Sequence, residues 1–312
     1  MQVFRGIPEH AAHASVLTIG NFDGVHRGHQ ALLQMLTDTA RAYALPAVVL
    51  TFEPHPREYF SPSDAPARLA SLREKLLLLA ASGVDHVHVC RFDARLAALP
   101  ADRFIDDILV RGLGVRHLII GDDFRFGARR QGDFALLQAC GASQGFVVEA
   151  MHTLDLAGER ASSSAVREAL AEGDLAHAAR LLGRPYSIAG RVIRGDQIGR
   201  KLGFPTANIQ MKHRKPALAG VFAVSVEGLG DKPVAGVANI GVRPSVTSAG
   251  KPTLEVNLFD WNRDCYDAHL RVHFLKKLRD ETKFASLDAL KAQIAKDADD
   301  ARAWFAQNPI RP

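Results

Sequence analysis

Cysteine is scarce in this chain of 312 residues, and the three that occur, Cys90, Cys140 and Cys265, lie far apart. An odd number of distant cysteines gives neither a disulfide framework nor a Cys-x-x-Cys metal site, so we expect small buried thiols in a reducing compartment. No apolar run approaches the roughly 18 residues of a membrane span, and the amino-terminal segment lacks the apolar centre of a secretory signal. We therefore expect a cytoplasmic protein without a membrane partner.

Positive charge is only slightly in excess, because the chain has 39 Lys and Arg and 34 Asp and Glu. No dense Lys and Arg run indicates a nucleic-acid arm, and aromatic residues make up only 7% of the chain, so no nucleic-acid partner is expected. The mild basic excess suits an enzyme that handles phosphates. At ~150 residues per domain the length predicts two domains. Oligomeric state does not follow from any of these features.

In the first half of the chain, short apolar runs alternate with helical patterns. Strands are expected at 15–20, 47–52, 86–92, 116–121 and 146–151, and helices at 30–43, 71–82, 102–113, 134–143, 163–171 and 174–182. This alternation predicts an α/β domain of βαβ units, with a parallel sheet covered by helices on both faces. Ligands of such sheets bind at the carboxyl ends of the strands.

After Leu182 the apolar period changes to two. Within 253–260, for example, Leu254 and Val256 alternate with Glu255. Further strands are expected at 221–227, 234–240 and 269–275, and five or so antiparallel strands predict an all-β barrel or sandwich. A last helix is expected at about 286–305, with Ser286 as its N-cap. The change of pattern predicts two domains, residues 1–184 and residues 185–312.

The strongest chemical signal is Gly20-Asn-Phe-Asp-Gly-Val-His-Arg-Gly-His29, between the first strand and the first helix. Gly20, Gly24 and Gly28 let the backbone turn tightly and approach a ligand closely. A helix N-terminus offers N–H groups and a positive dipole to phosphate, and His26 and His29 can donate hydrogen bonds where charge builds up in phosphoryl transfer. The alternatives are an ordinary turn with incidental histidines and a zinc site, for which no third ligand is evident.

Three segments accompany this loop. Thr51-Phe-Glu-Pro-His-Pro56 ends the second strand and is either a cleft wall or merely a stiff loop. Asp123 follows the fourth strand, where a ligand loop is expected. The helix expected at 163–171 begins with hydroxyl and guanidinium groups. These groups either bind a phosphate or are an ordinary serine cap with solvent-exposed arginines. Its candidate residues are Arg160, Ser163, Ser164 and Arg167.

The second half carries one glycine-rich segment that ends in Leu-Gly-Phe-Pro-Thr-Ala-Asn208. Its backbone N–H groups and cations could wrap an ATP phosphate tail, although it is not a Walker A loop, and a flexible barrel loop is the alternative. Thr206 and Asn208 offer oxygen ligands, which Mg²⁺ prefers. Glu255 could accept a proton from an attacking hydroxyl, whereas an exposed strand Glu without a role is commoner. The candidate phosphate-binding residues are Gly195, Gly199, Arg200, Lys201, Gly203 and Pro205.

The loop GNFDGVHRGH resembles the HxGH motif of the nucleotidylyltransferase superfamily, and LGFPTAN resembles the flavokinase signature. In this order the chain resembles the prokaryotic bifunctional riboflavin kinase/FMN adenylyltransferase (FAD synthetase) family over about residues 14–305. The resemblance implies a Rossmann-like nucleotidylyltransferase domain followed by a flavokinase barrel. It also implies ATP-dependent phosphorylation of riboflavin to FMN in the barrel, and adenylylation of FMN to FAD with release of pyrophosphate in the first domain. ATP is then the co-substrate and Mg²⁺ the cofactor.

The resemblance also implies residue roles. Glu255 matches the catalytic base, and Thr206 and Asn208 match the residues that hold Mg²⁺. Asp123 stands where some members have Asn, and Ser164 replaces Thr, so a member with one degenerate module is an open alternative, as is a non-catalytic flavin-binding or RNA-binding regulator. The implied nucleotide and flavin contacts are Gly20, Phe22, Asp23, Gly24, Gly28, Asp123, Arg160, Ser163, Ser164, Arg167 and Asn239, together with the glycine-rich segment.

Overall fold

The computed structural model describes residues 1–312 except 152–154, 157, 196–202, 213–214, 243–251 and 311–312. Contacts within the chain divide it into two compact units. The first unit comprises Met1–Pro66 and Leu72–Ser162, and the second comprises Ala67–Ser71 and Ser163–Pro312. Each unit is described by itself.

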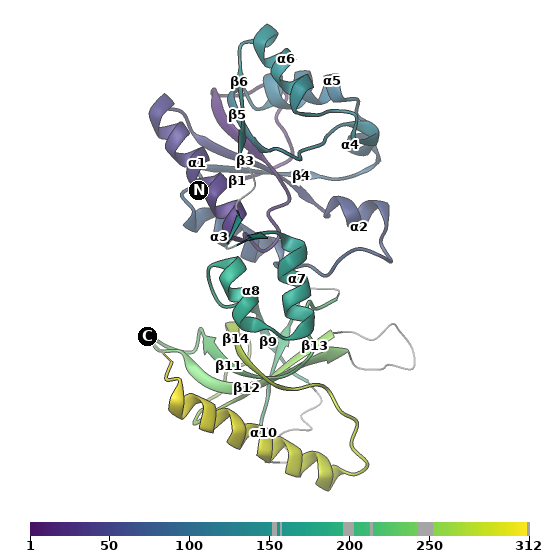
Figure 1. Ribbon diagram of the computed structural model, residues 1–312. Helices are drawn as coiled ribbons and strands as arrows, with labels where there is room; N and C mark the ends of the chain where they lie inside the picture. The colour runs from purple at the N-terminus through teal and green to yellow at the C-terminus, as the bar shows by residue number, and fades with distance from the viewer. Residues whose placement is uncertain (152–154, 157, 196–202, 213–214, 243–251, 311–312) are drawn as a thin grey trace. The chain divides into compact units, whose positions relative to one another are not determined.

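The first unit contains a six-stranded parallel sheet with the order β1-β4-β3-β2-β5-β6 (Figure 1). Strands β3 and β4 follow β2 on one side of the sheet, and β5 and β6 follow on the other. The strand order therefore reverses at β2. The carboxyl ends of β2 and β5 therefore form the switch point at which doubly wound sheets bind their ligands. The strands are β1 (Gln2–Arg5), β2 (Ser15–Ile19), β3 (Ala47–Glu53), β4 (His86–Arg91), β5 (Val115–Gly121) and β6 (Val147–Met151), and a separate hairpin pairs β7 (Asp155–Leu156) with β8 (Glu159–Arg160).

Helices cover both faces of this sheet. On one face α1 (Arg27–Tyr43) and α3 (Leu72–Ala81) bury leucines against Val49 of β3. On the other, the π-helix η1 (Phe104–Gly112) and α6 (Phe134–Gln144) pack against Val48 and Leu50. Neighbouring β3 residues thus enter different cores, which confirms the predicted α/β fold. Shorter helices are α2 (Pro56–Phe60), α4 (Ala94–Ala97), α5 (Ala101–Arg103) and the 3-10 turn η2 (Ala128–Arg130).

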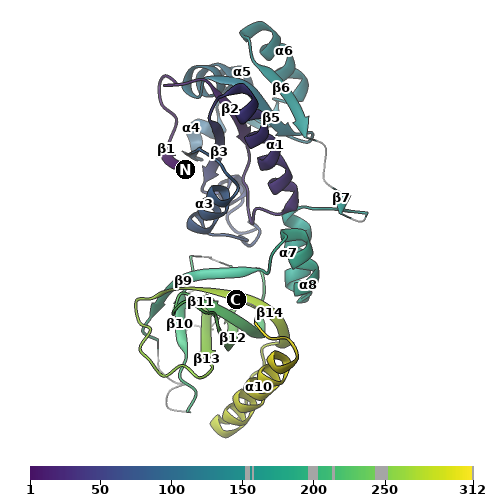
Figure 2. The same cartoon turned by 90° about the vertical axis from the view of Figure 1, so that its left-hand side faces the viewer.

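The second unit contains a closed antiparallel barrel with the order β10-β13-β12-β11-β14-β9 (Figure 2). Its interior holds alternate residues of each strand, among them Phe222, Phe274 and Val256, which are at most 1% exposed. Of the predicted alternatives, barrel and sandwich, the barrel is the one that forms. The strands are β9 (Ser187–Ile193), β10 (Ala207–Gln210), β11 (Gly220–Glu227), β12 (Val234–Val242), β13 (Pro252–Leu258) and β14 (His269–Arg279), and the helices of this unit are α7 (Ser163–Glu172), α8 (Leu175–Leu182) and α10 (Leu287–Gln307).

The long helix α10 lies along the outside of the barrel (Figure 2). It begins at the predicted cap, where the Ser286 hydroxyl accepts a hydrogen bond from the Ala289 N–H at 3.1 Å. Its apolar side packs through Ala301 on Ala223 of β11. Near the middle of the helix the buried Asp297 accepts hydrogen bonds from Arg279 of β14, at 2.7 Å from Nη2 and 2.9 Å from Nε. This pair joins the helix to the barrel wall.

The differences from the sequence predictions include two strands and one helix. Strand β1 was not predicted because all four of its residues are exposed, which leaves no apolar alternation. Strand β10 was not predicted because it has only four residues and begins within the end of the glycine-rich segment. The helix predicted at 102–113 is α-helical only through Arg103 and continues as the π-helix η1, although its apolar residues still face the core.

The first prediction concerns the ion pair under α10. Asp297→Ala leaves the partly buried Arg279 guanidinium without its carboxylate, so the free energy of unfolding of the second unit should fall by about 3 kcal/mol. Tryptophan fluorescence during guanidinium unfolding reports on this unit, because both tryptophans of the chain, Trp261 and Trp304, lie in it. Asp300→Ala, at an exposed position of the same helix, is the matched control and should change stability little. Equal effects of the two substitutions would contradict the role of the pair.

Candidate functional sites in the two units

The two histidines of the loop between β2 and α1 lie side by side at the start of the helix. His26 is the N-cap of α1, and its Nδ1 accepts a hydrogen bond from the backbone N–H of His29 at 3.3 Å. The two imidazole rings stack with their centroids 3.7 Å apart. The structure therefore brings the two predicted catalytic residues together, and the cap orients one ring against the other.

Glycine is required in this loop by close packing and by backbone conformation. A Cβ on Gly28 would lie 3.1 Å from the carbonyl oxygen of Ala161 and 3.2 Å from the His26 ring. Gly24 has a φ of 76°, in the left-handed region that favours glycine. Phe22 shares that region with a φ of 48°, is fully buried and lies with its ring centroid 5.0 Å from that of His29. The neighbouring predicted contact Asp23 is only 4% exposed.

The electrostatics at His29 favour a neutral imidazole. Burial lowers its pKa well below the usual 6.5, and the positive charges of His26 and Lys75 lower it further. A neutral imidazole carries one N–H and one lone pair. Among the described residues, no partner hydrogen-bonds to the buried Nδ1 of His29, to Thr18 Oγ1 or to Asn21 Oδ1. Buried polar atoms without partners are rare, and here three of them gather around one loop, as expected for a site that takes a polar ligand.

A cleft of about 1300 Å³ opens at the carboxyl end of the sheet, where Gly20 and Asn21 follow β2 and Asp123 follows β5. Its position agrees with the switch point of the strand order. Aromatic rings contribute much of its lining. Phe60 is 64% exposed and lies edge-on to Phe92, with centroids 5.6 Å apart. The aromatic residues that line the cleft are Phe52, Phe60, Phe92, Phe104, Phe124 and Phe126.

Cations line the same cleft beside the aromatic rings. Arg57, Arg125, Arg129 and Arg130 are all among its lining residues. Arg129 and Arg130 have φ values of 54° and 59°, a conformation that costs free energy in residues with a Cβ. The loop after β5 thus holds two strained arginines at a cavity wall, which suits an anionic ligand.

Two predicted ligand residues pair with each other across the first unit. Arg160 Nη2 donates to Asp123 Oδ2 at 2.6 Å, and both side chains are more than half exposed. Asp123 and Arg160 therefore lie together, as expected for one site. The other predicted residues of that segment, Ser163, Ser164 and Arg167, begin α7 in the second unit, where Arg167 Nε donates to the Ala67 carbonyl at 2.6 Å.

In the barrel, strand register sets three polar residues in one row. Asn208 of β10 lies opposite Glu255 of β13, and Glu255 lies opposite Asn239 of β12. Residues directly opposite in antiparallel strands have Cβ atoms about 5 Å apart. Glu255 is half-buried on the outer face, while its neighbours Leu254 and Val256 fill the barrel interior. The structure thus brings Glu255, Asn208 and Asn239 together.

The segment before β10 packs closely around Asn208. A Cβ on Gly195 would overlap the Asn208 side-chain amide, so this position needs glycine. Asn208 Nδ2 is directed to the Thr206 carbonyl at 3.5 Å, and the carbonyl of Pro205 accepts from Asn257 Nδ2 at 2.8 Å. Gly203 has a φ of 90°. Gly199, Arg200 and Lys201 lie outside the described residues.

The aromatic cleft was missed at the sequence level, apart from the expectation that 51–56 lines a cleft, which Phe52 and Pro56 do. Its rings come from the ends of β3, β4 and β5 and from α2 and η1, and no short sequence window contains them together. The sequence could have indicated the cleft through the positions of three of these residues. Phe52, Phe92 and Phe124 each lie at or just after the carboxyl end of a parallel strand.

The fold defines a class of two-unit proteins. One unit is a doubly wound sheet with a glycine- and histidine-containing loop at its switch point, and the other is a closed barrel with an amide–carboxylate–amide row. Family comparison makes the class specific. The model of the FAD synthetase family matches residues 8–165, and that of the riboflavin kinase family matches residues 182–305. The chain belongs to the bifunctional riboflavin kinase/FMN adenylyltransferase family.

Relatives of that name align over almost the whole chain. The protein of Escherichia coli (strain K12) is 53% identical over 98% of both chains, and that of Pseudomonas fluorescens is 52% identical over 100% of both. A crystal structure from Streptococcus pneumoniae, described as a macrolide-efflux protein, shares the fold with a TM-score of 0.82 and 28% identity, over 97% of this chain and 99% of that one. Among the residues that the structure describes, no helix is both long and apolar enough to cross a membrane.

The second prediction concerns the charge on His29. Lys75 is buried, and its positive charge lowers the pKa of His29, so Lys75→Met should raise that pKa toward 6.5 without reaching it, because burial remains. NMR titration of the imidazole resonances measures the shift. Arg73→Met removes an exposed cation from the same helix and should leave the pKa unchanged. A wild-type His29 that titrates at or above 6.5 would contradict the neutral imidazole.

Proposed function

We propose that the barrel phosphorylates the 5′-hydroxyl of riboflavin with ATP to give FMN, and that the first unit transfers AMP from a second ATP to FMN to give FAD. The observation that carries this proposal is that two family models, for FAD synthetase and riboflavin kinase, match successive parts of one chain. Each match falls largely on a unit whose geometry suits the reaction. The module boundary between residues 184 and 185, a cytoplasmic location and the lack of a nucleic-acid partner stay predictions.

In the kinase reaction Glu255 acts as the general base. The hydroxyl oxygen of riboflavin attacks the γ-phosphorus of ATP, the bond from that phosphorus to the bridging oxygen breaks, and ADP leaves. The proton of the hydroxyl passes to the Glu255 carboxylate, which the register places between the amides of Asn208 and Asn239. The protein thereby positions the reactants and receives the proton, which is most of what phosphoryl transfer requires.

Oxygen donors near Glu255 suit Mg²⁺. The Thr206 hydroxyl and the Asn208 amide oxygen would hold the ion, which binds through few protein oxygens when substrate phosphates supply others. The close fit of Gly195 against the Asn208 amide supports this role, since it holds that side chain in place. When bound, Mg²⁺ neutralises charge on the ATP phosphates. Backbone N–H groups of the segment with Gly195, Gly199 and Gly203, and the side chains of Arg200 and Lys201, are proposed to hold the phosphate tail.

In the adenylyl transfer, FMN itself is the nucleophile. An oxygen of the FMN phosphate attacks the α-phosphorus of ATP, the bond to the oxygen bridging the α- and β-phosphates breaks, and pyrophosphate leaves. No proton has to be removed from the attacking phosphate anion. His26 and His29 lie at the N-terminus of α1. They stabilise the negative charge that develops on the α-phosphate as the adenylyl group is transferred.

The surrounding contacts are assigned to ATP and FMN on chemical grounds. Gly20, Gly24 and Gly28 let the loop approach the phosphates, and the buried Phe22 and Asp23 hold its shape. Ser163, Ser164 and Arg167 are assigned to the triphosphate. The Arg160–Asp123 pair is assigned to the nucleotide. The edge of the Arg160 guanidinium that does not contact Asp123 would donate hydrogen bonds to a phosphate.

The aromatic cleft suits the flavin ring of FMN, because flat rings stack on aromatic side chains while nearby arginines attract the phosphate. Phe60 is the test position, since it is exposed and its truncation disturbs no core.

The third prediction follows from that assignment. Phe60→Ala should raise the KM for FMN in adenylyl transfer about tenfold, because loss of one aromatic contact costs up to about 1.4 kcal/mol. The KM for riboflavin in the kinase reaction should not change. Tyr43→Ala, an exposed aromatic outside the cleft, is the matched control. An unchanged KM for FMN would refute the ring assignment.

The fourth prediction tests the division of labour. His29→Ala should slow FAD formation roughly 100-fold and leave FMN formation intact. Glu255→Gln should slow FMN formation by a similar factor and leave FAD formation from supplied FMN intact. Chromatographic separation of the flavins measures both rates. Glu227→Gln, on an exposed carboxylate of the same barrel, is the control, and equal loss of both activities in either site variant would contradict two separate sites.

A further inference from the structure

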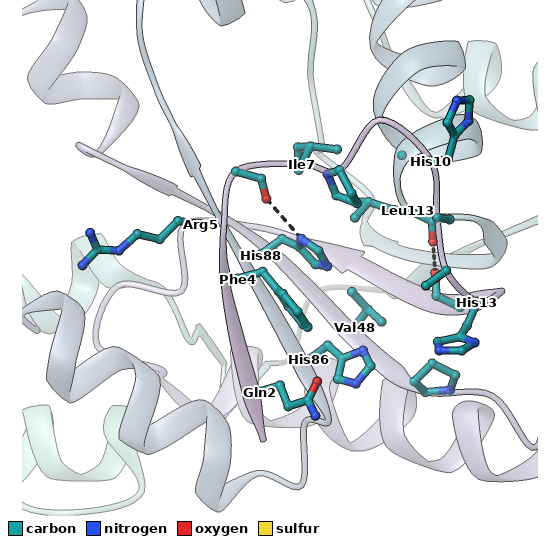
Figure 3. A pocket seen from close by; sticks show the side chains of 17 residues that line it. Gln2, Phe4, Arg5, Ile7, His10, His13, Val48, His86, His88 and Leu113 are labelled. Carbon is teal, nitrogen blue, oxygen red and sulfur yellow. Dashed lines mark hydrogen bonds between the residues drawn. The ribbon is translucent and has the colours of Figure 1, made fainter.

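Figure 3 shows a second cavity of the first unit. It lies at the amino ends of the parallel strands, whereas the aromatic cleft lies at their carboxyl ends. It has a volume of about 390 Å³, in the range of small-molecule sites. Its lining includes residues that begin parallel strands, namely Gln2 of β1, Ser15 of β2 and His86 of β4. Neither the adenylyl transfer nor the kinase reaction uses these residues.

The wall of this cavity is held in place. The segment of residues 6–13, which we name the amino-terminal loop, is tied by the Gly6 N–H to the Val89 carbonyl at 2.9 Å and by the Ala11 N–H to the Arg111 carbonyl at 2.8 Å. A Cβ on Gly112 would lie 2.5 Å from Ile7 Cγ2, so the loop packs directly on the chain before β5. These contacts fix the wall of the cavity, as expected for a small-molecule site that is largely pre-formed.

Imidazole rings distinguish the cavity from an ordinary packing defect. His10 and His13 come from the amino-terminal loop, and His86 and His88 come from β4. Phe4 of β1 stacks on His88 with centroids 4.9 Å apart and meets His86 edge-on at 5.5 Å. Figure 3 shows the Phe4, His86 and His88 rings gathered beside Val48. The site thus combines flat rings and an apolar floor with polar nitrogens.

The titratable side chains that line the cavity are all basic. Among its described lining residues none is Asp or Glu, and the titratable ones are the four histidines and Arg5, whose side chain extends away from the rings in Figure 3. His88 Nδ1 lies 3.1 Å from the Gly6 carbonyl, which fits an Nδ1–H donor, and burial lowers the pKa of His88 below its usual value. No group of three or more His, Cys, Asp or Glu among the described residues is arranged to hold a metal ion. An anion is therefore the better match than a cation.

We propose that this cavity binds a small planar aromatic anion, such as an aromatic phosphate or carboxylate, at a site separate from both catalytic centres. The ring of the ligand stacks against Phe4 and His88, and its anionic group accepts hydrogen bonds from the imidazoles of His13 and His86.

The fifth prediction tests this site with phenyl phosphate as the probe and the full chain as the protein. Imidazole resonances of His10, His13, His86 and His88 should shift together along one saturating curve in NMR titration, without a matching shift at His26 and His29. The double variant His13→Leu/His86→Leu should weaken binding at least about tenfold, since charge-assisted hydrogen bonds are worth more than 1.4 kcal/mol. FMN and FAD formation by this variant should stay unchanged, which confirms that the fold is intact.

Inorganic phosphate and benzyl alcohol are the matched probes. Inorganic phosphate carries the anionic group without the ring, and benzyl alcohol carries the ring without the anionic group. Both should bind more weakly than phenyl phosphate. Equal affinity for inorganic phosphate would reduce the site to an anion site and refute the ring contact, and equal affinity for benzyl alcohol would refute anion recognition. Shifts confined to His26 and His29, or no saturable shift of the four cavity histidines, would overturn the proposal.

Discussion

Strand register in the closed barrel is the constraint on which the proposed kinase site depends. Side chains alternate between the two faces of a strand, so a shift of one residue in β13 would turn Glu255 into the barrel and Leu254 out to solvent. The interior prevents such a shift, because Leu254 and Val256 are at most 1% exposed there. Apolar packing inside the barrel thereby determines that Glu255 faces outward between Asn208 and Asn239. The position of the proposed general base therefore depends on apolar residues on the opposite face of its strand.

A comparable constraint governs the first unit, although its strands are parallel. Here the order of strands, rather than their register, brings the ends of β2 and β5 together, and the loops that follow them meet at the cleft. His26 then serves twice, since its ring caps α1 and lies against the ring of His29. The cost of this arrangement is visible in the buried Nδ1 of His29, which has no hydrogen-bond partner in the described part of the chain, and in the strained backbone of Arg129 and Arg130.

Sequence periodicity predicted most of the fold because buried strands and amphipathic helices differ in their apolar spacing. The glycine-rich loop with His26 and His29 and the row residues Asn208 and Glu255 were also found, since each lies in a short motif. The aromatic cleft was not found, because Phe60, Phe92 and Phe124 become neighbours only through tertiary packing. The exposed strand β1 and the cavity of the four histidines escaped prediction for the same reason, as neither carries a local period.

The central claim is that one chain carries two successive flavin reactions in two separate sites. The most direct measurement is a time course of the wild-type protein with riboflavin, ATP and Mg²⁺, in which the flavins are separated by chromatography. The account predicts that FMN forms from riboflavin and that FAD follows from FMN. Riboflavin that stays unchanged, with FMN also unconverted when it is supplied, would contradict the account.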